Sequence, residues 1–453
     1  MFRELLAQRE ASGDPIHVGI IGAGKFGSGL VVQLSKVPGI CASAVADISL
    51  ERARDAYHYS GVDVETIFHA ETAGQLGDAI SKGQPAVTED ATLITGAGSI
   101  DVVVEATGIP EAGADNAVSA IDNGKHLVMV NIETDVTVGT LLKSKADKAG
   151  VVYTLVDGDQ PGCIMNLYEW AQTLGFEIVA AGRGTIYYKS DREGTPDSVA
   201  ERFQFSEEIL DRRHINVKMY NSFRDGTKAQ LEMTALANMT GFSPDIRGMH
   251  EPSCNLEDIP RVFCLKEEGG ILHQDGVVEL VNSVAVDGIS MLPNPLKMGV
   301  FVVIRTDHPF IREDLRSYDC LEGADGKTFL LYRPYHLVAV EAPMSIAKAF
   351  LYSSPTGAPQ KQPVADVIAV AKRNLKKGEI LDGSGGFTVN GIIEKTDIVR
   401  NDQLLPLGLA SEAVLLRDVT EGEAITYATV ILNEHSHVLQ LRREQDQLMV
   451  SQS

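Results

Sequence analysis

The sequence predicts an α/β protein: a doubly wound parallel sheet, then an α+β domain, then a small β-rich C-terminal domain. Two observations predict the sheet, namely a glycine-rich turn after the first apolar strand and an alternation of strands with helices up to about residue 155. A stretch rich in proline and glycine at 353–363 indicates a linker. We therefore expect three domains, at 1–155, 156–352 and 353–453.

The first element is the stretch 17–29, with the sequence HVGIIGAGKFGSG. An apolar run ends in glycines spaced Gly-x-Gly-x-x-Gly, and an apolar-periodic helix follows. In a Rossmann fold the first glycine allows the turn, the second admits a pyrophosphate and the third lets the helix pack against the strand. The alternative is a glycine-rich turn that binds nothing. We expect a dinucleotide to be bound here by Gly22, Gly24, Lys25, Phe26 and Gly27.

The second strand, 42–46, ends at Asp47. This carboxylate lies where an acidic side chain takes the ribose hydroxyls of the adenosine half, which favours NAD. Arg52 follows closely and could instead hold the 2′-phosphate of NADP. Asp47 could also be a helix N-cap. The residues alone leave the choice between NAD and NADP open.

Two further strands are predicted at 102–105 and 127–130, whereas 60–99 resembles an insertion without chemistry. Ligands of parallel sheets collect at the carboxyl ends of the strands. The polar or turn residues expected at these ends are Thr107, Gly108, Asn131 and Glu133. We expect the first three to contact the cofactor and Glu133 to shape the reacting end of the site. The structural alternatives are an ordinary turn at the end of a strand for Thr107 and Gly108, and an acidic residue that interacts with the helix dipole for Glu133.

The middle domain carries the best catalytic candidates, in a helix over 229–240 and the preceding SFRDGTK. Lys228 and Glu232 are four residues apart and share a helix face, and Asp225 precedes the first turn. A lysine beside two carboxylates can transfer a proton at a carbonyl oxygen. A surface ion pair is the alternative. Asn238, on the same helix, is a candidate substrate contact.

A second group of cations follows other predicted strands of the middle domain, at 299–305 and 329–333 among them. Lys189, Arg192, Arg333 and His336 could together clamp a phosphate or carboxylate of the substrate. Scattered solvated charge is the alternative. His308, in a turn, is a weaker candidate for an acid or base at the substrate. A helix at 343–352 is expected to return towards the first domain.

The composition excludes several classes of partner and site. The chain has 40 Lys and Arg against 62 Asp and Glu, a net charge of −22, so nucleic acid and anionic membranes are not expected partners. The five cysteines form no Cys-x-x-Cys pair, which favours reduced thiols in a cytoplasm. No signal peptide or apolar span is expected. No acidic residues have a spacing diagnostic of a metal site, so the metal ligands stay unassigned.

Seven stretches carry a family resemblance: HVGIIGAGKFGSG, DVVVEATGIPEAG, KHLVMVNIETDVTVG, SFRDGTKAQLEMTALANMTG, GVFVVIRTDHPF, LYRPYHLVAVEAP and AKRNLKKGEILDG. Their order resembles that of homoserine dehydrogenase-like oxidoreductases with a C-terminal SAF domain. Within that group the chain is similar to the 1-deoxy-D-xylulose 5-phosphate reductoisomerase-like enzymes. Homoserine dehydrogenases carry a lysine soon after the fifth strand, but here the sequence is Asn-Ile-Glu-Thr at 131–134, which speaks against homoserine oxidation.

The resemblance implies a homodimer, NADPH (NADH being the alternative), a divalent cation such as Mg²⁺ or Mn²⁺, and a catalytic and dimerisation role for the middle domain. The implied reaction rearranges a ketose phosphate to a branched aldehyde and reduces it to 2-C-methyl-D-erythritol 4-phosphate, in isoprenoid precursor biosynthesis. Lys228 with Asp225 and Glu232 would stabilise charge on adjacent oxygens.

Two other functions remain open on the sequence. One is an NAD-dependent oxidoisomerase or dehydrogenase of a branched sugar acid such as D-apionate. The other is a non-catalytic protein that senses NAD(P) or acts as a scaffold, with the SAF-like domain binding a partner. The SAF-like domain has a faint internal repeat, in which residues 370–380 resemble residues 415–425. This repeat predicts a compact β module that serves regulation, packing or assembly.

Overall fold

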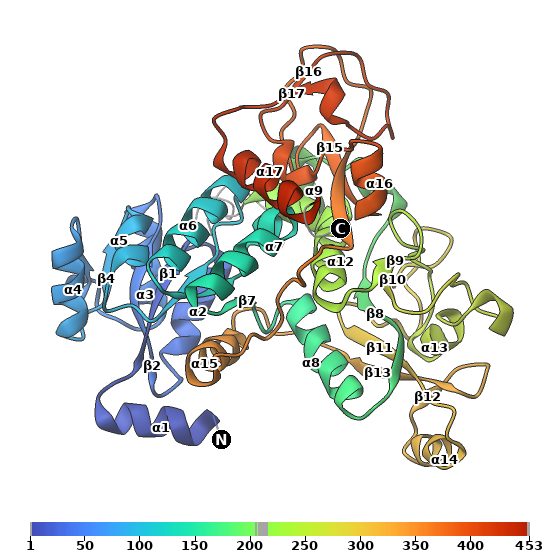
Figure 1. Ribbon diagram of the computed structural model, residues 1–453, viewed down its shortest axis with the longest axis horizontal. Helices are drawn as coiled ribbons and strands as arrows, with labels where there is room; N and C mark the ends of the chain where they lie inside the picture. Colours follow the sequence, from blue (N-terminus) through green and yellow to red (C-terminus); the bar gives the residue numbers. More distant parts are fainter. Residues whose placement is uncertain (1, 204–205, 207–215, 451–453) are drawn as a thin grey trace. The chain divides into compact units, whose positions relative to one another are not determined.

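The chain forms two compact units in the computed structural model, which describes residues 2–203, 206 and 216–450 (Figure 1). Unit 1 consists of 1–162, 337–361 and 435–453, and unit 2 consists of 163–336 and 362–434. The segment 353–453, expected as a third domain, is therefore divided between the two units. No helix among the described residues is long and apolar enough to cross a lipid bilayer.

Unit 1 contains a seven-stranded sheet in the order β3-β4-β2-β1-β5-β6-β7, and every neighbouring pair of strands is parallel. The strands are β1 (Ile16–Ile21), β2 (Ile40–Ala46), β3 (Phe68–His69), β4 (Ala86–Thr88), β5 (Val102–Glu105), β6 (His126–Met129) and β7 (Tyr153–Leu155). β5 is buried along its whole length, as expected of a strand covered on both faces. The predicted Rossmann-type sheet is confirmed.

Helices cover both faces of this sheet. They are α1 (Phe2–Ser12), α2 (Lys25–Leu34), α3 (Leu50–Tyr59), η1 (Val64–Thr66), α4 (Ala73–Ser81), α5 (Ala91–Gly96), α6 (Pro110–Asp122), α7 (Ile132–Ala149), α15 (Ala342–Tyr352) and α17 (His437–Val450). α2 packs against α3 and α15, whereas α6 packs against α5, α7 and α17. The fold is doubly wound because these are two separate layers of helices.

The segment 60–99 is part of the sheet, which corrects its interpretation as an insertion. It supplies β3 and β4, and β4 pairs with β2 from Ala44 opposite Ala86 to Ala46 opposite Thr88. Two-residue and three-residue strands give no readable periodicity, so the sequence pattern did not reveal them.

Segments from the second half of the chain complete unit 1. α15 returns to it as predicted, and the stretch expected to be a linker is bonded to β7: Leu155 N–H donates to Gly357 O at 2.8 Å. α17, from the last part of the segment predicted as a third domain, packs on α6 and α7. There Ser436 donates to Glu111 at 2.7 Å, and Leu141 N–H donates to Gln445 at 2.9 Å.

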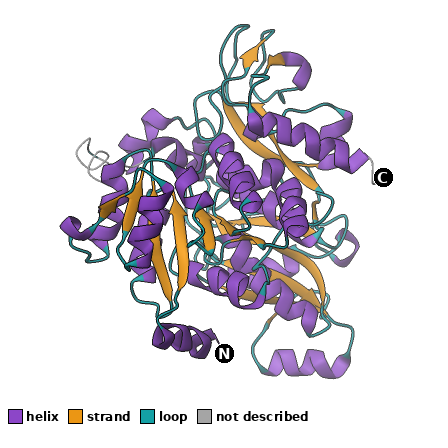
Figure 2. Cartoon of the chain, turned by 60° about the vertical axis from the view of Figure 1, so that its left-hand side comes forward, coloured by secondary structure: helices purple, strands orange, loops and turns teal. Residues whose placement is uncertain are grey.

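Unit 2 has a mixed six-stranded sheet in the order β12-β13-β11-β8-β10-β9. Figure 2 draws the strands of the chain in orange and its helices in purple. Its strands are β8 (Glu177–Thr185), β9 (Ser243–Pro244), β10 (Val277–Asn282), β11 (Val300–Arg305), β12 (Leu321–Glu322) and β13 (Thr328–Arg333). Its helices are α8 (Gln160–Thr173), η2 (Lys189–Asp191), α9 (Pro196–Phe203), α11 (Val217–Arg224), α12 (Thr227–Thr240), η3 (Leu256–Asp258), α13 (Ile259–Val262), η4 (Lys266–Glu268) and α14 (Pro309–Ser317). β8 and β10 run parallel, and β11 is antiparallel to β8. The mixed sheet with helices agrees with the expected α+β class.

The C-terminal part of unit 2 is a small β module packed on α12. It contains β14 (Ala365–Ala371), β15 (Val389–Lys395), α16 (Thr396–Asn401), η5 (Leu407–Leu409), β16 (Val414–Leu415), η6 (Tyr427–Thr429) and β17 (Val430–Ile431). The internal repeat has a structural counterpart, because Leu375 and Val419 exchange both backbone hydrogen bonds. Each copy also holds an equivalent ion pair, Arg373 with Glu379 and Arg417 with Glu423.

Candidate active site

The glycine turn of unit 1 has the geometry of a dinucleotide site. Gly22 takes a left-handed φ of 100°, and a Cβ there would lie 2.7 Å from the carbonyl oxygen of Ala106. A Cβ at Gly27 would lie 1.9 Å from the carbonyl oxygen of Gly22, so α2 can approach β1 only with glycine at this position. Gly24 is the N-cap of α2, and a Cβ at this position would contact no protein atom. The open space at Gly24 is where a pyrophosphate can approach backbone N–H groups.

The two other residues predicted in this turn differ from each other. Lys25 is exposed at the first position of α2. Phe26 is half-buried and packs against the hydrophobic core of unit 1, so it also has a structural role.

Asp47 is bonded to the turn itself. Its Oδ2 accepts from the N–H of Ala23 at 2.8 Å, and its Oδ1 accepts from the N–H of Ser49 at 2.9 Å. Arg52 forms an ion pair with Oδ1 at 2.5 Å. The carboxylate thus stiffens the glycine turn, and its charge is already matched by Arg52. This is a different situation from a carboxylate that is free to receive ribose hydroxyls.

A buried network lies behind the next strand end. Thr107 Oγ1 donates to Glu105 at 2.5 Å, and Asn131 Nδ2 donates to Thr107 Oγ1 at 3.2 Å. Asn131 Oδ1 caps α7 by accepting from Thr134 N–H at 3.1 Å. Asn131 is buried, so it positions the strand ends and has no exposed face for a cofactor. Gly108 has a left-handed φ of 69°, and a Cβ at this position would contact no protein atom.

Glu133 belongs to the first turn of α7 in unit 1 and is buried. The other predicted catalytic residues, Lys228, Asp225 and Glu232, belong to unit 2. The structure therefore describes Glu133 only within the nucleotide unit.

Unit 2 has its own candidate site, at the end of the sheet where β8 and β10 finish. Asn282, the last residue of β10, accepts from the N–H of Tyr187 at 3.2 Å and donates to its carbonyl at 2.8 Å. The Tyr187 ring packs against Gly226, whose φ of 86° turns the chain into α12. Lys228, partly exposed in the first turn of α12, therefore lies at this end of the sheet.

Glu251 and Arg192 reach the same end from two other segments. Asn282 N–H donates to the carbonyl of Pro252 at 2.9 Å, so Glu251 lies beside the end of β10. Burial raises the pKa of Glu251 to about 7, and Arg192 opposes part of that shift. Arg192 is exposed and makes no ion pair with another described residue. A carboxyl group titrating near neutral pH beside a cation can transfer a proton and orient an anion.

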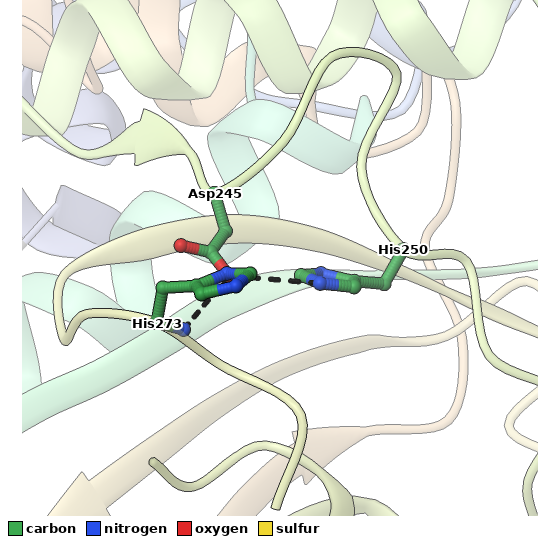
Figure 3. A group of neighbouring side chains, drawn as sticks. All are labelled: Asp245, His250 and His273. Atoms are coloured by element: carbon green, nitrogen blue, oxygen red, sulfur yellow. Dashed lines mark hydrogen bonds and ion pairs between the residues drawn. The ribbon is translucent and has the colours of Figure 1, made fainter. Parts of the chain in front are cut away.

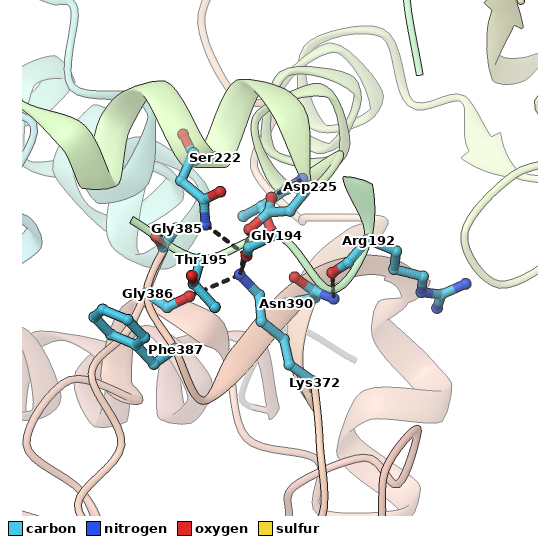
Figure 4. A network of polar contacts seen from close by, with 12 residues as sticks. Arg192, Gly194, Thr195, Ser222, Asp225, Lys372, Gly385, Gly386, Phe387 and Asn390 are labelled. Atoms are coloured by element: carbon cyan, nitrogen blue, oxygen red, sulfur yellow. Dashed lines mark hydrogen bonds and ion pairs between the residues drawn. The ribbon is translucent and has the colours of Figure 1, made fainter. Parts of the chain in front are cut away.

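Asp225 does not have the position that a catalytic acid needs. Its carboxylate is buried and bonded to the ammonium of Lys372 at 2.7 Å, and that ammonium also donates to the carbonyls of Gly194 and Gly386 (Figure 4). Burial raises the pKa of Asp225, against the opposing effect of Lys372. Its other oxygen caps α12 at Thr227. Asp225 therefore joins α12 to the C-terminal module.

Glu232 and Asn238 are likewise buried in structural contacts. Glu232 pairs with Arg183 of β8, and both side chains are almost fully enclosed. Asn238 accepts from the N–H groups of Val364 and Ala365 at 2.9 and 3.1 Å, which fixes the start of β14 on α12. A substrate cannot reach these groups without displacing the contacts.

The sheet register separates the other predicted residues. Val300 pairs with both Arg183 and Arg333, so Arg333 lies at the same end of the sheet as Tyr187. Lys189 follows that end of β8 and is exposed, and His336 Nδ1 is bonded to Met298 O at 2.9 Å.

His308 follows the opposite end of β11, where Arg305 pairs with Thr328. It is the exposed N-cap of α14. The structure therefore does not bring His308 together with the predicted cations.

The comparisons concern mainly this part of the chain. Residues 158–342 match the family model described as "Oxidoreductase DRL, catalytic domain". This segment is therefore similar to the catalytic domain of an oxidoreductase. Tyr187, Arg192, Lys228 and Glu251 all fall inside the matched segment. No curated protein sequence matches the chain.

The chain is also weakly similar to several solved structures. Levoglucosan dehydrogenase in complex with NADH is 16% identical, over 40% of this chain and 46% of that one, with a TM-score of 0.29. A myo-inositol dehydrogenase from Lactobacillus casei is 16% identical, over 41% and 50%, at 0.27. A DOX-P reductoisomerase is 14% identical, over 48% and 56%, at 0.31. The chain thus spans about half the length of each of these structures, and such low similarity says nothing about its substrate.

Sequence reasoning missed three residues of unit 2. Tyr187 and Glu251 had no motif around them, and Lys372 lies 147 positions from its partner Asp225. A left-handed φ of 48° at Glu251 marks an unusual backbone, but a sequence does not show it.

Proposed function

We propose that this protein is an NADPH-dependent, homodimeric reductoisomerase that converts 1-deoxy-D-xylulose 5-phosphate to 2-C-methyl-D-erythritol 4-phosphate. The observation that carries the proposal is the convergence of Lys228, Arg192 and Glu251 at one end of the unit 2 sheet, inside the segment that matches an oxidoreductase catalytic domain. The motif resemblance supplies the substrate.

The glycine turn would hold the cofactor. Backbone N–H groups at the start of α2, beside the open space at Gly24, suit its pyrophosphate. Because Arg52 already balances Asp47, an adenosine 2′-phosphate would meet a cation instead of an unpaired carboxylate, which supports NADPH over NADH. When bound, the nicotinamide supplies the hydride that reduces the branched aldehyde.

Lys228 and the nearby cations would act on the sugar phosphate. The ammonium of Lys228 would donate hydrogen bonds to the carbonyl and hydroxyl oxygens on which negative charge develops during the rearrangement. Arg192 would bind the phosphate, helped by Lys189, Arg333 and His336 at the same end of the sheet. A protein with a net charge of −22 needs such local cations to hold an anionic substrate.

The divalent cation implied by the resemblance has no oxygen-rich site near Lys228 among the described residues. The two carboxylates predicted to act with Lys228, Asp225 and Glu232, are ion-paired with Lys372 and Arg183. Mg²⁺ and Mn²⁺ prefer oxygen ligands in an open arrangement. The proposed mechanism therefore assigns no step to a metal ion.

The test is an assay of the purified protein with 1-deoxy-D-xylulose 5-phosphate and NADPH, with and without Mg²⁺, following the loss of nicotinamide absorbance. We expect NADPH oxidation and one equivalent of 2-C-methyl-D-erythritol 4-phosphate. Binding of NADPH without turnover of any sugar would favour the non-catalytic sensor or scaffold instead.

A second candidate is an NAD-dependent oxidoisomerase or dehydrogenase of a branched sugar acid such as D-apionate. The exposed guanidinium of Arg192 can bind a carboxylate as well as a phosphate, and Asp47 stands at the position that favours NAD. Reduction of NAD with the sugar acid, and no reaction with the sugar phosphate, would replace the first function by this one.

A further inference from the structure

Asp245, His250 and His273 come together in unit 2 from two loops, the first of which carries both Asp245 and His250 (Figure 3). Asp245 follows β9, His250 ends a tight turn, and His273 precedes β10. Asp245 Oδ2 lies 2.9 Å from Nδ1 of His273 and 3.6 Å from Nε2 of His250. Among the described residues, this is the one group of three or more Asp, Glu, His or Cys whose ligand atoms lie within 4.8 Å of one another.

A buried carboxylate fixes the orientation of His250. Glu279, in the middle of β10 and fully enclosed, is bonded to Nδ1 of His250 at 2.6 Å and accepts from its backbone N–H at 3.1 Å. With Nδ1 occupied, Nε2 faces Asp245. In metal sites, a histidine ligand commonly donates a hydrogen bond to a carboxylate from the ring nitrogen that does not bind the metal. This bond sets the tautomer and the orientation of the ring.

The backbone around His250 supports the same role. Met249 and Glu251 have left-handed φ values of 68° and 48°, which are uncommon for residues other than glycine. Such conformations persist where the surrounding structure or a ligand requires them. The turn is therefore built to present His250 at this place.

We propose that Asp245 Oδ2, His250 Nε2 and His273 Nδ1 bind one divalent transition-metal ion of the Zn²⁺ type, with water in the fourth position. Two imidazoles and one carboxylate suit Zn²⁺ better than Mg²⁺. Ligand atoms of a tetrahedral zinc site lie about 3.3 Å apart. The observed separations of 2.9 and 3.6 Å from Asp245 bracket that value.

Lys266 competes with the ion for His273. Its ammonium lies 2.6 Å from Nε2 of His273, and the lysine is exposed. When a metal ion binds Nδ1 of His273, the proton of the neutral ring is on Nε2. Nε2 then no longer accepts from the Lys266 ammonium, which has to turn away. Removing this ammonium should strengthen metal binding.

The site does not depend on the proposed reaction. Its ligands lie beside β9 and the first half of β10, and His250 is the one ligand that is adjacent in sequence to a residue of the candidate active site, Glu251. Lys228 and Arg192 lie at the end of the sheet where β10 finishes. Binding can be measured without substrate or cofactor, so failure of the metal site and failure of the proposed function are distinguishable.

The experiment titrates the chelator-treated full chain with Zn²⁺ by calorimetry and with Co²⁺ by visible absorption. We expect one ion per chain and the d–d bands of a four-coordinate Co²⁺ site. His250→Ala and His273→Ala should each weaken binding by at least about tenfold. Lys266→Ala should tighten it several-fold.

The matched control is His437→Ala, because His437 forms an exposed pair with a single carboxylate, Asp115, in unit 1. This variant should bind the ion like the unmodified chain. His273 is half exposed, so its variant is expected to fold even where His250→Ala does not, as circular dichroism will report. Absence of stoichiometric binding, or unchanged affinity in His273→Ala or Lys266→Ala, overturns the assignment.

Discussion

Asp135 is a fully buried carboxyl group in the first turns of α7, and it makes the stability of unit 1 depend on pH. It accepts from Tyr153 at 2.7 Å, while its second oxygen has no partner among the described residues. Burial raises the pKa of Asp135 from 3.8 to about 7. Between these values the folded state binds more protons than the unfolded state, so the free energy of unfolding falls as pH rises from about 4 to 7.

We predict that Asp135→Asn removes this pH dependence and is the more stable form at pH 8. The gain is at most about 4 kcal/mol, which corresponds to a shift of about three pKa units. Urea unfolding of both proteins at pH 5 and pH 8 measures it. If both lose the same stability between these pH values, Asp135 is not held protonated.

Arg52 is predicted to determine the preference for NADPH. Arg52→Ala removes a cation from the 2′-phosphate and leaves Asp47 unpaired, so the Kd for NADPH should rise roughly tenfold or more while that for NADH changes little. Fluorescence titration of both cofactors provides the measurement, with Lys36→Ala, exposed just after α2, as the control. An equal change for both cofactors would show that Arg52 acts only through the fold of the turn.

At the residue scale, the sequence could predict the chemical types present but not their burial. Asp225, Glu232 and Asn238 had the spacing of a catalytic group, yet each is used to pack α12 against β8 or the C-terminal module. Their partners Lys372 and Arg183 lie far away in the chain, so no local pattern indicates them. Gly22 and Gly27 were predictable because their roles are set by backbone sterics within a few residues.

At the scale of elements, the ion pair between Asp225 and Lys372 holds α12 to the C-terminal module. Lys372→Met leaves a buried carboxylate and two carbonyls without their donor, so we predict a loss of roughly 3 kcal/mol in the free energy of unfolding. The midpoint of urea unfolding measures this loss.

Lys376→Met is the matched control, because Lys376 pairs with Asp418 in full solvent exposure. Its unfolding midpoint should not change. Equal effects of the two substitutions would mean that burial does not strengthen the contact of Lys372 with α12.

Long elements were predictable and short or distant ones were not. The predicted strand at 102–105 and the predicted helix at 229–240 agree with β5 and α12, because apolar runs and turn glycines define them locally. β3 and β4 are too short to show a period. α17 packs on α6 and α7 through contacts between residues more than 300 positions apart in the chain, such as Gln445 and Leu141, and no local pattern indicates such contacts.

At the scale of the whole molecule, we propose that unit 1 binds the cofactor and that unit 2 carries out the chemistry. The sequence predicted this division in outline, since a glycine turn precedes a helix with a lysine and several cations. It could not predict that the chain crosses between the units more than once, because the order of segments does not record which unit each packs against. The division of labour itself is open to a direct test.

The most direct measurement compares Lys228→Met with the unmodified protein in NADPH binding and in NADPH oxidation with 1-deoxy-D-xylulose 5-phosphate. Lys327→Met, at the opposite end of the β11–β13 pair, is the control. The account predicts an unchanged Kd for NADPH and a kcat at least about a hundredfold lower for Lys228→Met alone. An unchanged kcat, or a loss explained entirely by weaker NADPH binding, would contradict it.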